Sequence, residues 1–188
     1  MKTTINLKMM AEKEACDEAA TTFRKAHGQK TVLLSEALES NGLQEAFWWI
    51  QNNELTPKQE KDIRLLACDY AEHTLHIFEG RHPDDKRPRE AIETARLYIN
   101  SDATKEELQK AADAARDAAR DAARDADAAA YAAYAAAADY AAYVAAADYA
   151  DYAARDAAYA AYAARDAERE YQKEELKKVF LKWEQVRC

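Results

Sequence analysis

The chain has 188 residues, of which 49% are hydrophobic and 33% are charged, and its formal net charge at pH 7 is −8. This length suits one sizeable hydrophobic core and is short for two. The negative charge argues against a general binder of nucleic acid or of anionic membranes, because both ligands attract basic surfaces.

The cysteines and the first ten residues indicate a cytoplasmic protein. Cys16, Cys68 and Cys188 lack the spacing of a zinc site, so reduced thiols in a cytoplasmic protein are expected. The polar stretch Met1–Met10 lacks the apolar core of a signal peptide. No run reaches the roughly 20 apolar residues of a membrane span.

Helix signals come in chain order through the first half. Residues from Lys8 to His27 are predicted to be helical, with Gly28 as a C-terminal stop. Val32–Glu39 is predicted to be a short second helix that ends at Asn41-Gly42. The segment that follows, Leu43–Asn52, carries the densest apolar patch of the chain.

Later helices begin at clear caps. Thr56-Pro57-Lys58-Gln59 combines a capping hydroxyl, a proline at the first helical position and a glutamine at the third. The helix that follows is predicted to end at Glu79-Gly80. Pro88 opens another helix, and the capping box Thr104-Lys105-Glu106-Glu107 opens the alanine-rich tail.

The fold class follows from these patterns. No segment shows the alternation of a β-strand, so the sequence predicts an all-α fold. We expect a multi-helix bundle in one domain, residues 1–188. A capped N-terminal helical half (1–103) would pack on the long helices of an alanine-rich half (104–188).

The tail has few alternatives to helix, because more than half of residues 111–170 are alanine, the strongest helix former. One straight helix from Thr104 to Val186 would be about 120 Å long, at about 1.5 Å per residue. A compact domain of this size is about 40 Å across. We therefore expect two or three tail helices that fold back, or one long helix enclosed on several sides.

The tail is also acidic and aromatic. Asp125–Ala154 contains five aspartates, six tyrosines and no basic residue. Such a composition suits a surface that occupies a basic, nucleic-acid-binding groove of a partner protein. The alternative is that the tyrosines are core and the aspartates keep the helices soluble. The residues assigned to the partner surface are Tyr131, Tyr134, Asp139, Tyr140, Tyr143, Asp148, Tyr149, Asp151 and Tyr152.

Residues 81–96, called the charged motif below, concentrate arginines and acids around two prolines. In one interpretation Arg87, Arg89 and Arg96 form an anion or ligand site, because guanidinium groups hold carboxylates or phosphates bidentately. In the other, Asp84 or Asp85 neutralises the arginines and the loop is tied to neighbouring helices by internal salt bridges.

Evidence for catalysis is slight. Asp69, His73 and His76 occupy positions i, i+4 and i+7 of one helix and could face a single metal ion, although a solvated helix face explains them equally well. The chain has no Gly-x-Ser-x-Gly motif and no glycine-rich phosphate loop. We expect no metal, no cofactor and no enzymatic activity.

Three segments resemble a known family. They are Leu43–Trp49, Leu66–Glu79 and, above all, Pro83–Arg96 followed by the alanine-rich run. From Thr31 onward the chain is similar to the Imm-5-like immunity proteins of bacteria and phages. The resemblance implies an all-helical, non-enzymatic protein that protects its bearer by binding something harmful. It singles out Asp84, Asp85, Arg87, Arg89, Glu93 and Arg96.

Together these observations predict a protective or inhibitory binding protein. It would be an immunity protein, or a phage-encoded inhibitor of a bacterial defence enzyme, that occludes its target through the acidic, tyrosine-rich surface. Two alternatives stay open: a sponge that holds a nucleotide-like signal in an arginine and tyrosine pocket, and a self-assembling helical spacer. Alanine-rich faces also favour a homodimer.

The tail assignment can be tested by substitution. Replacing Tyr140, Tyr143, Asp148 and Asp151 by alanine should weaken target binding, because aromatic contact area and negative potential are lost. Helicity measured by circular dichroism should be unchanged, since alanine favours helix. Unchanged binding in a calorimetric titration would remove this part of the tail from the interface.

Overall fold

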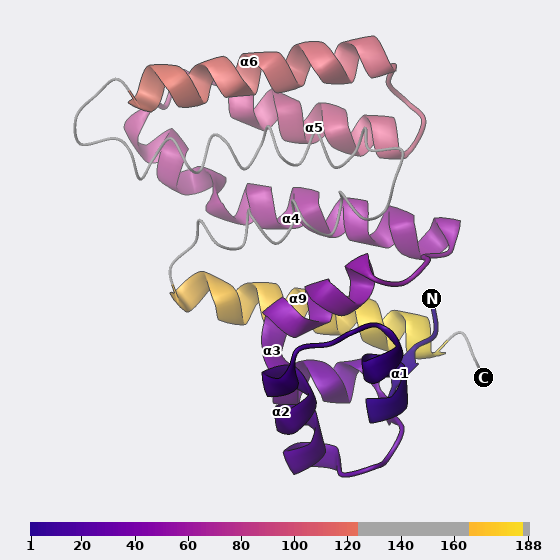
Figure 1. Ribbon diagram of the computed structural model, residues 1–188. Coiled ribbons are helices and arrows are strands. Elements are labelled where there is room, and N and C mark those ends of the chain that lie inside the picture. Colours follow the sequence, from indigo (N-terminus) through magenta and orange to yellow (C-terminus); the bar gives the residue numbers. More distant parts are fainter. Residues whose placement is uncertain (124–165, 186–188) are drawn as a thin grey trace.

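The computed structural model describes residues 1–123 and 166–185, which form helices and one short strand pair (Figure 1). The mostly helical fold class predicted from the sequence is confirmed. The elements in chain order are β1 (Thr4–Ile5), α1 (Leu7–Glu12), α2 (Asp17–His27), β2 (Val32–Leu33), α3 (Leu34–Gln51), α4 (Pro57–Arg81), α5 (Arg87–Ile99), α6 (Lys105–Ala123) and α9 (Asp166–Gln185).

Helix α4 lies at the centre and contributes to two hydrophobic clusters. In Figure 1, α5 and α6 lie on one side of α4, and α3 and α9 lie on the other. Ile63, Leu66 and Tyr70 belong to the cluster that includes α3 and α9. Ala71 and Leu75 belong to the cluster with α5 and α6. The long apolar repeat of α4 therefore serves two cores, which explains why its apolar positions are not confined to one narrow stripe.

Alanine sets the packing of α5 against α6. Ala91 and Ala95 of α5 are fully buried in the same cluster as Ala112 and Ala115 of α6. Side chains this small let two helix axes approach closely, and close packing brings dispersion contacts that longer side chains would prevent. Leu108 is the large side chain that α6 adds to this core.

The C-terminal helix α9 returns to the N-terminal half. The Tyr70 hydroxyl donates a hydrogen bond of 2.7 Å to the Gln172 carbonyl, although Tyr70 lies on α4. Leu108, near the start of α6, packs in a cluster with Leu75, which also lies on α4. One straight helix from Thr104 to Val186 would hold residues 108 and 172 nearly 100 Å apart, at about 1.5 Å per residue, and is therefore excluded. The number of helices within 124–165 lies outside the described residues.

The N-terminal prediction was wrong in one respect. Instead of one helix from Lys8 to His27, the chain forms α1 and α2, separated by a break at Lys13–Cys16. Glu14 adopts a left-handed φ of 60°, and the Cys16 thiol caps α2 by accepting from the Ala19 amide at 3.4 Å. The predicted stop at Gly28 is confirmed, with a φ of 63°.

Val32 does not start a helix. Val32 and Leu33 form β2, which pairs antiparallel with β1 in the register Thr4↔Leu33 and Ile5↔Val32. Two residues per strand are too few for an alternating pattern to be visible, and Ile5 enters the core through this pairing. Helix α3 begins at Leu34, and at the predicted stop its helical geometry is interrupted: Gly42 has a non-helical backbone, and two helical segments meet there at a kink.

The predicted caps of the later helices are confirmed. The Thr56 hydroxyl accepts from the Gln59 amide at 3.3 Å, and the Gln59 side chain accepts from the Thr56 amide at 3.0 Å. Thr104 and Glu107 make the same reciprocal pair ahead of α6. Within residues 1–123 and 166–185, no helix has both the length and the hydrophobicity needed to cross a bilayer.

The backbone conformations of Gly42 and Gly80 predict that substitution by alanine changes stability in opposite directions. Gly42 has φ 82° and ψ −179°, a conformation that is nearly restricted to glycine, so Gly42→Ala should lower the free energy of unfolding by about 1–3 kcal/mol. Gly80 lies within α4, where Gly80→Ala should raise it by up to about 1 kcal/mol. An added Cβ meets no atom within 4 Å at either position, so packing cannot cause the difference. Urea denaturation followed by circular dichroism would measure both changes; equal effects would contradict the backbone explanation.

Candidate functional site

The charged motif leads from α4 into α5, and its first arginine bridges two elements. Arg87 donates to Asp85 through Nε at 2.9 Å and through Nη2 at 2.7 Å. The same Nη2 lies 3.0 Å from Oδ2 of Asp121 on α6. Hydrogen bonding to Arg87 lowers the pKa of Asp85, and hydrogen bonding to Asp85 raises the pKa of Arg87. Arg87 therefore ties the loop to α6.

The second arginine joins α5 to α4. Arg89 donates to both carboxylate oxygens of Glu79, through Nε and Nη2, each at 2.7 Å. This two-pronged geometry is the strong form of an arginine–carboxylate pair. Hydrogen bonding to Arg89 lowers the pKa of Glu79 and so keeps this carboxyl ionised.

The third arginine makes two bonds to α4. Arg96 reaches Asp69 through Nη2 and Glu72 through Nη1, each at 2.6 Å. Partial burial raises the pKa of Asp69, and the bond to Arg96 opposes this shift. The neighbouring thiol of Cys68 is fully buried, and burial raises its pKa to about 12, so it is protonated and unreactive at neutral pH.

These contacts match the internal salt-bridge interpretation of the charged motif. All three arginines are paired with carboxylates, and Asp85, not Asp84, is the acid of the motif that pairs with Arg87. Asp84 and Glu93 are exposed and remain outside the pairs. The partners that sequence reasoning did not name are Asp69, Glu72, Glu79 and Asp121. The spacing of Arg89 and Arg96, seven apart on one face of a helix, was the available signal.

The three residues considered for a metal ion have other partners. Asp69 is bonded to Arg96. The His73 ring stacks on Tyr171 of α9 with centroids 3.6 Å apart and planes 10° apart. Nδ1 of His76 lies 2.8 Å from the His73 carbonyl oxygen. In the part of the chain that the structure describes, no group of three or more histidine, cysteine, aspartate or glutamate side chains converges on one point.

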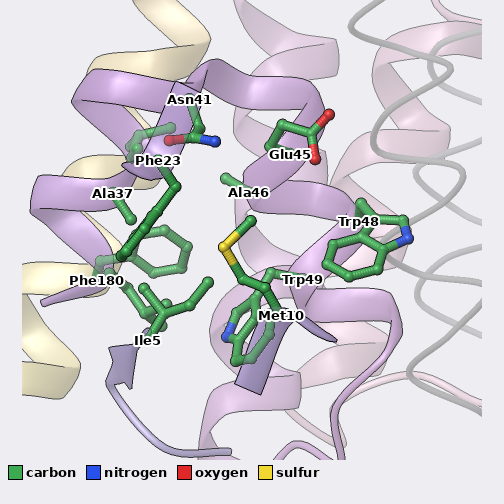
Figure 2. A pocket seen from close by; sticks show the side chains of 12 residues that line it. Ile5, Met10, Phe23, Ala37, Asn41, Glu45, Ala46, Trp48, Trp49 and Phe180 are labelled. Carbon is green, nitrogen blue, oxygen red and sulfur yellow. The ribbon is translucent and has the colours of Figure 1, made fainter. Parts of the chain in front are cut away.

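The tyrosine and aspartate residues assigned to partner binding, from Tyr131 to Tyr152, lie outside the described residues. Hollows are found elsewhere, among the described residues, and two of them are relevant here. Figure 2 shows the first, an apolar cavity on which Met10, Phe23 and Trp49 converge. Its volume of about 20 Å³ leaves room for about one water molecule and for no larger ligand. The second is an open groove of about 610 Å³ between α3 and α9.

The pair between Glu79 and Arg89 should make stability depend on acid. The pKa of Glu79 lies below its ordinary value of 4.5, so the stabilisation is complete above that pH and is lost as the pH falls through the lowered value. Between about pH 6 and about pH 3, Glu79→Gln should lose less unfolding free energy than the parent. The difference should be about 1 kcal/mol or less, because the pair is partly solvated.

Arg89→Gln provides the matched control for this experiment. Without the guanidinium group, the pKa of Glu79 should return toward its ordinary value, so this variant should resemble Glu79→Gln. Urea denaturation is the suitable measurement, since urea carries no charge that would screen the pair. Identical acid dependence in the parent and both variants would contradict the assignment.

Comparison with known proteins assigns the region that contains these pairs. A family model described as "Imm-5 like putative immunity protein" matches residues 53–179. No curated protein and no solved structure matches the chain. The matched range includes α4, α5, α6 and most of α9, and so all the arginine pairs above, whereas the apolar Leu43–Trp49 segment lies outside it. Because this match covers well over half of the sequence, the chain belongs to the Imm-5-like family of immunity proteins.

Proposed function

We propose that this protein is a non-enzymatic immunity protein that binds a harmful partner, a toxin or a defence enzyme, and covers its basic functional surface. The observation that carries the proposal is the family match over residues 53–179. That range contains the ion-paired framework of α4, α5 and α6. The ion pairs connect these helices, and a surface ordered before binding reduces the entropy cost of association.

The charges outside the pairs support an acidic recognition surface. Asp84, Glu90 and Glu93 are exposed, and none of them forms an ion pair within the described part of the chain. The exposed bases of the same stretch are Arg81 and Lys86. This excess of carboxylates adds to the formal net charge of −8 and would steer a basic partner toward the α4–α5 loop and α5.

The contacts favour protein binding over the sponge for a nucleotide-like signal. In that alternative, Arg87, Arg89 and Arg96 would hold the phosphate groups. Each of these guanidinium groups already holds a carboxylate at 3.0 Å or less. An incoming phosphate would have to displace that carboxylate and leave it without a partner next to a second anion, which costs free energy.

Charge reversal tests the acidic surface. A double variant, Asp84→Lys with Glu93→Lys, should weaken binding to the partner by about tenfold or more, mainly through slower association, because two attractive charges become repulsive. The partner would be recovered by pull-down and identified by mass spectrometry. Association rates would then be measured by surface plasmon resonance at low and at physiological salt, together with protection of cells that express the partner.

The matched control is Glu12→Lys, which reverses an exposed acid at the end of α1, outside the region matched by the family. This variant should bind and protect like the parent. If the double variant also protects fully and associates at the parental rate, the surface of α5 is not the recognition surface.

A further inference from the structure

The groove between α3 and α9 lies where α3 kinks at Gly42, beside the first turns of α9. It has a volume of about 610 Å³, within the range of sites that hold small molecules or peptide side chains. Leu43, Phe47 and Trp48 of α3 form an apolar wall, and Gln172 of α9 also lines the groove. This hollow has no part in the ion-paired framework described above.

Gln172 gives the groove an unsatisfied polar group. The residue is only 2% exposed, and its backbone oxygen is bonded to the Tyr70 hydroxyl. Its side-chain Oε1 is buried and has no hydrogen-bond partner. A buried acceptor without a donor costs about 1–3 kcal/mol, so such an acceptor normally bonds to protein, to ordered water or to a ligand. The N–H of a peptide amide is an uncharged donor that suits this acceptor.

The charges around the groove cancel. Lys173 is bonded to Glu39 at 2.6 Å, and the adjacent Arg169 and Glu170 carry opposite charges. Among the described residues that line the groove, a phosphate or nucleotide would find no uncompensated positive charge. An uncharged ligand that combines amide groups with an apolar side chain fits the apolar wall and the unsatisfied Gln172 oxygen together.

A peptide segment has this chemistry. We propose that the α3–α9 groove binds a short uncharged peptide segment of the partner protein, with an apolar side chain against Phe47 and Trp48 and a backbone amide bonded to the Gln172 side chain. The inference rests on the proposed function only in taking the neutralised protein as the source of the segment. The binding site itself stands on the groove and on Gln172.

The test begins with a probe that needs no known partner. A library of random heptapeptides displayed on phage would be selected on the full-length protein, and the enriched peptide would be synthesised with capped ends. Calorimetry should show binding, and Gln172→Met should weaken it about three- to tenfold, which corresponds to the loss of one hydrogen bond. In contrast, Gln172→Met should keep or raise the thermal unfolding midpoint, because it removes a buried polar atom that has no partner.

This combination of weaker binding and undiminished stability separates a binding role from a structural one. Gln29→Met, an exposed glutamine in the loop after α2, is the matched control and should leave peptide affinity unchanged. In a nuclear magnetic resonance spectrum of the ¹⁵N-labelled protein, the peptide should shift the side-chain amide signal of Gln172. AMP should not shift this signal. Equal peptide affinity for the parent and Gln172→Met, an AMP-induced shift, or no enriched peptide would each overturn the proposal.

The two proposals can fail separately. A protein that binds the peptide but protects against no partner would contradict the proposed function and leave the groove as a peptide site. If Gln172→Met loses the peptide and still neutralises the partner with parental affinity, the groove is not where the partner binds.

Discussion

The return of α9 across α3 and α4 is the interaction on which the described architecture depends. It is made by polar contacts between distant parts of the chain: Trp183 Nε1 donates to Asp62 at 2.8 Å, and Glu184 accepts from both the amide and the hydroxyl of Ser35. Bringing residues 121 positions apart together costs loop-closure entropy. The burial of Leu176 and Phe180 offsets this cost. Without α9, the hydrophobic cluster formed with α3 and α4 would be exposed to solvent. The groove would also lack the side that α9 forms.

On the other side of α4, small side chains and long ones have complementary tasks. Alanines bring α6 close to α5, and this approach places Asp121 within reach of Arg87. The long arginine side chains then connect α4, α5 and α6 at the surface. The arginines of the charged motif therefore hold the helices together, and in the proposed function it is exposed acids such as Asp84 and Glu93 that would contact the partner.

Local signals in the sequence were sufficient for much of the fold. The caps at Thr56 and Thr104 and the stop at Gly28 depend on neighbouring residues, so they could be predicted. The break before Cys16 was missed because a thiol is an unusual cap. The acids that pair with Arg89 and Arg96 were missed because pairing depends on how α5 lies against α4. The Gln172 site could not be predicted at all, since it arises from two helices more than 100 residues apart.

The two proposed surfaces differ in physics and in position. The acidic surface lies on α5, and the groove lies between α3 and α9, on the other side of α4 (Figure 1). Attraction by exposed carboxylates is long-ranged, weak in salt and tolerant of geometry, so it suits capture of any basic partner. The proposed peptide site, with one unsatisfied acceptor, would act only at contact and would disfavour segments that cannot donate to it. Of the two helices that line this groove, most of α9 lies within the range matched by the family, whereas Gly42–Gln51 of α3 lies outside it.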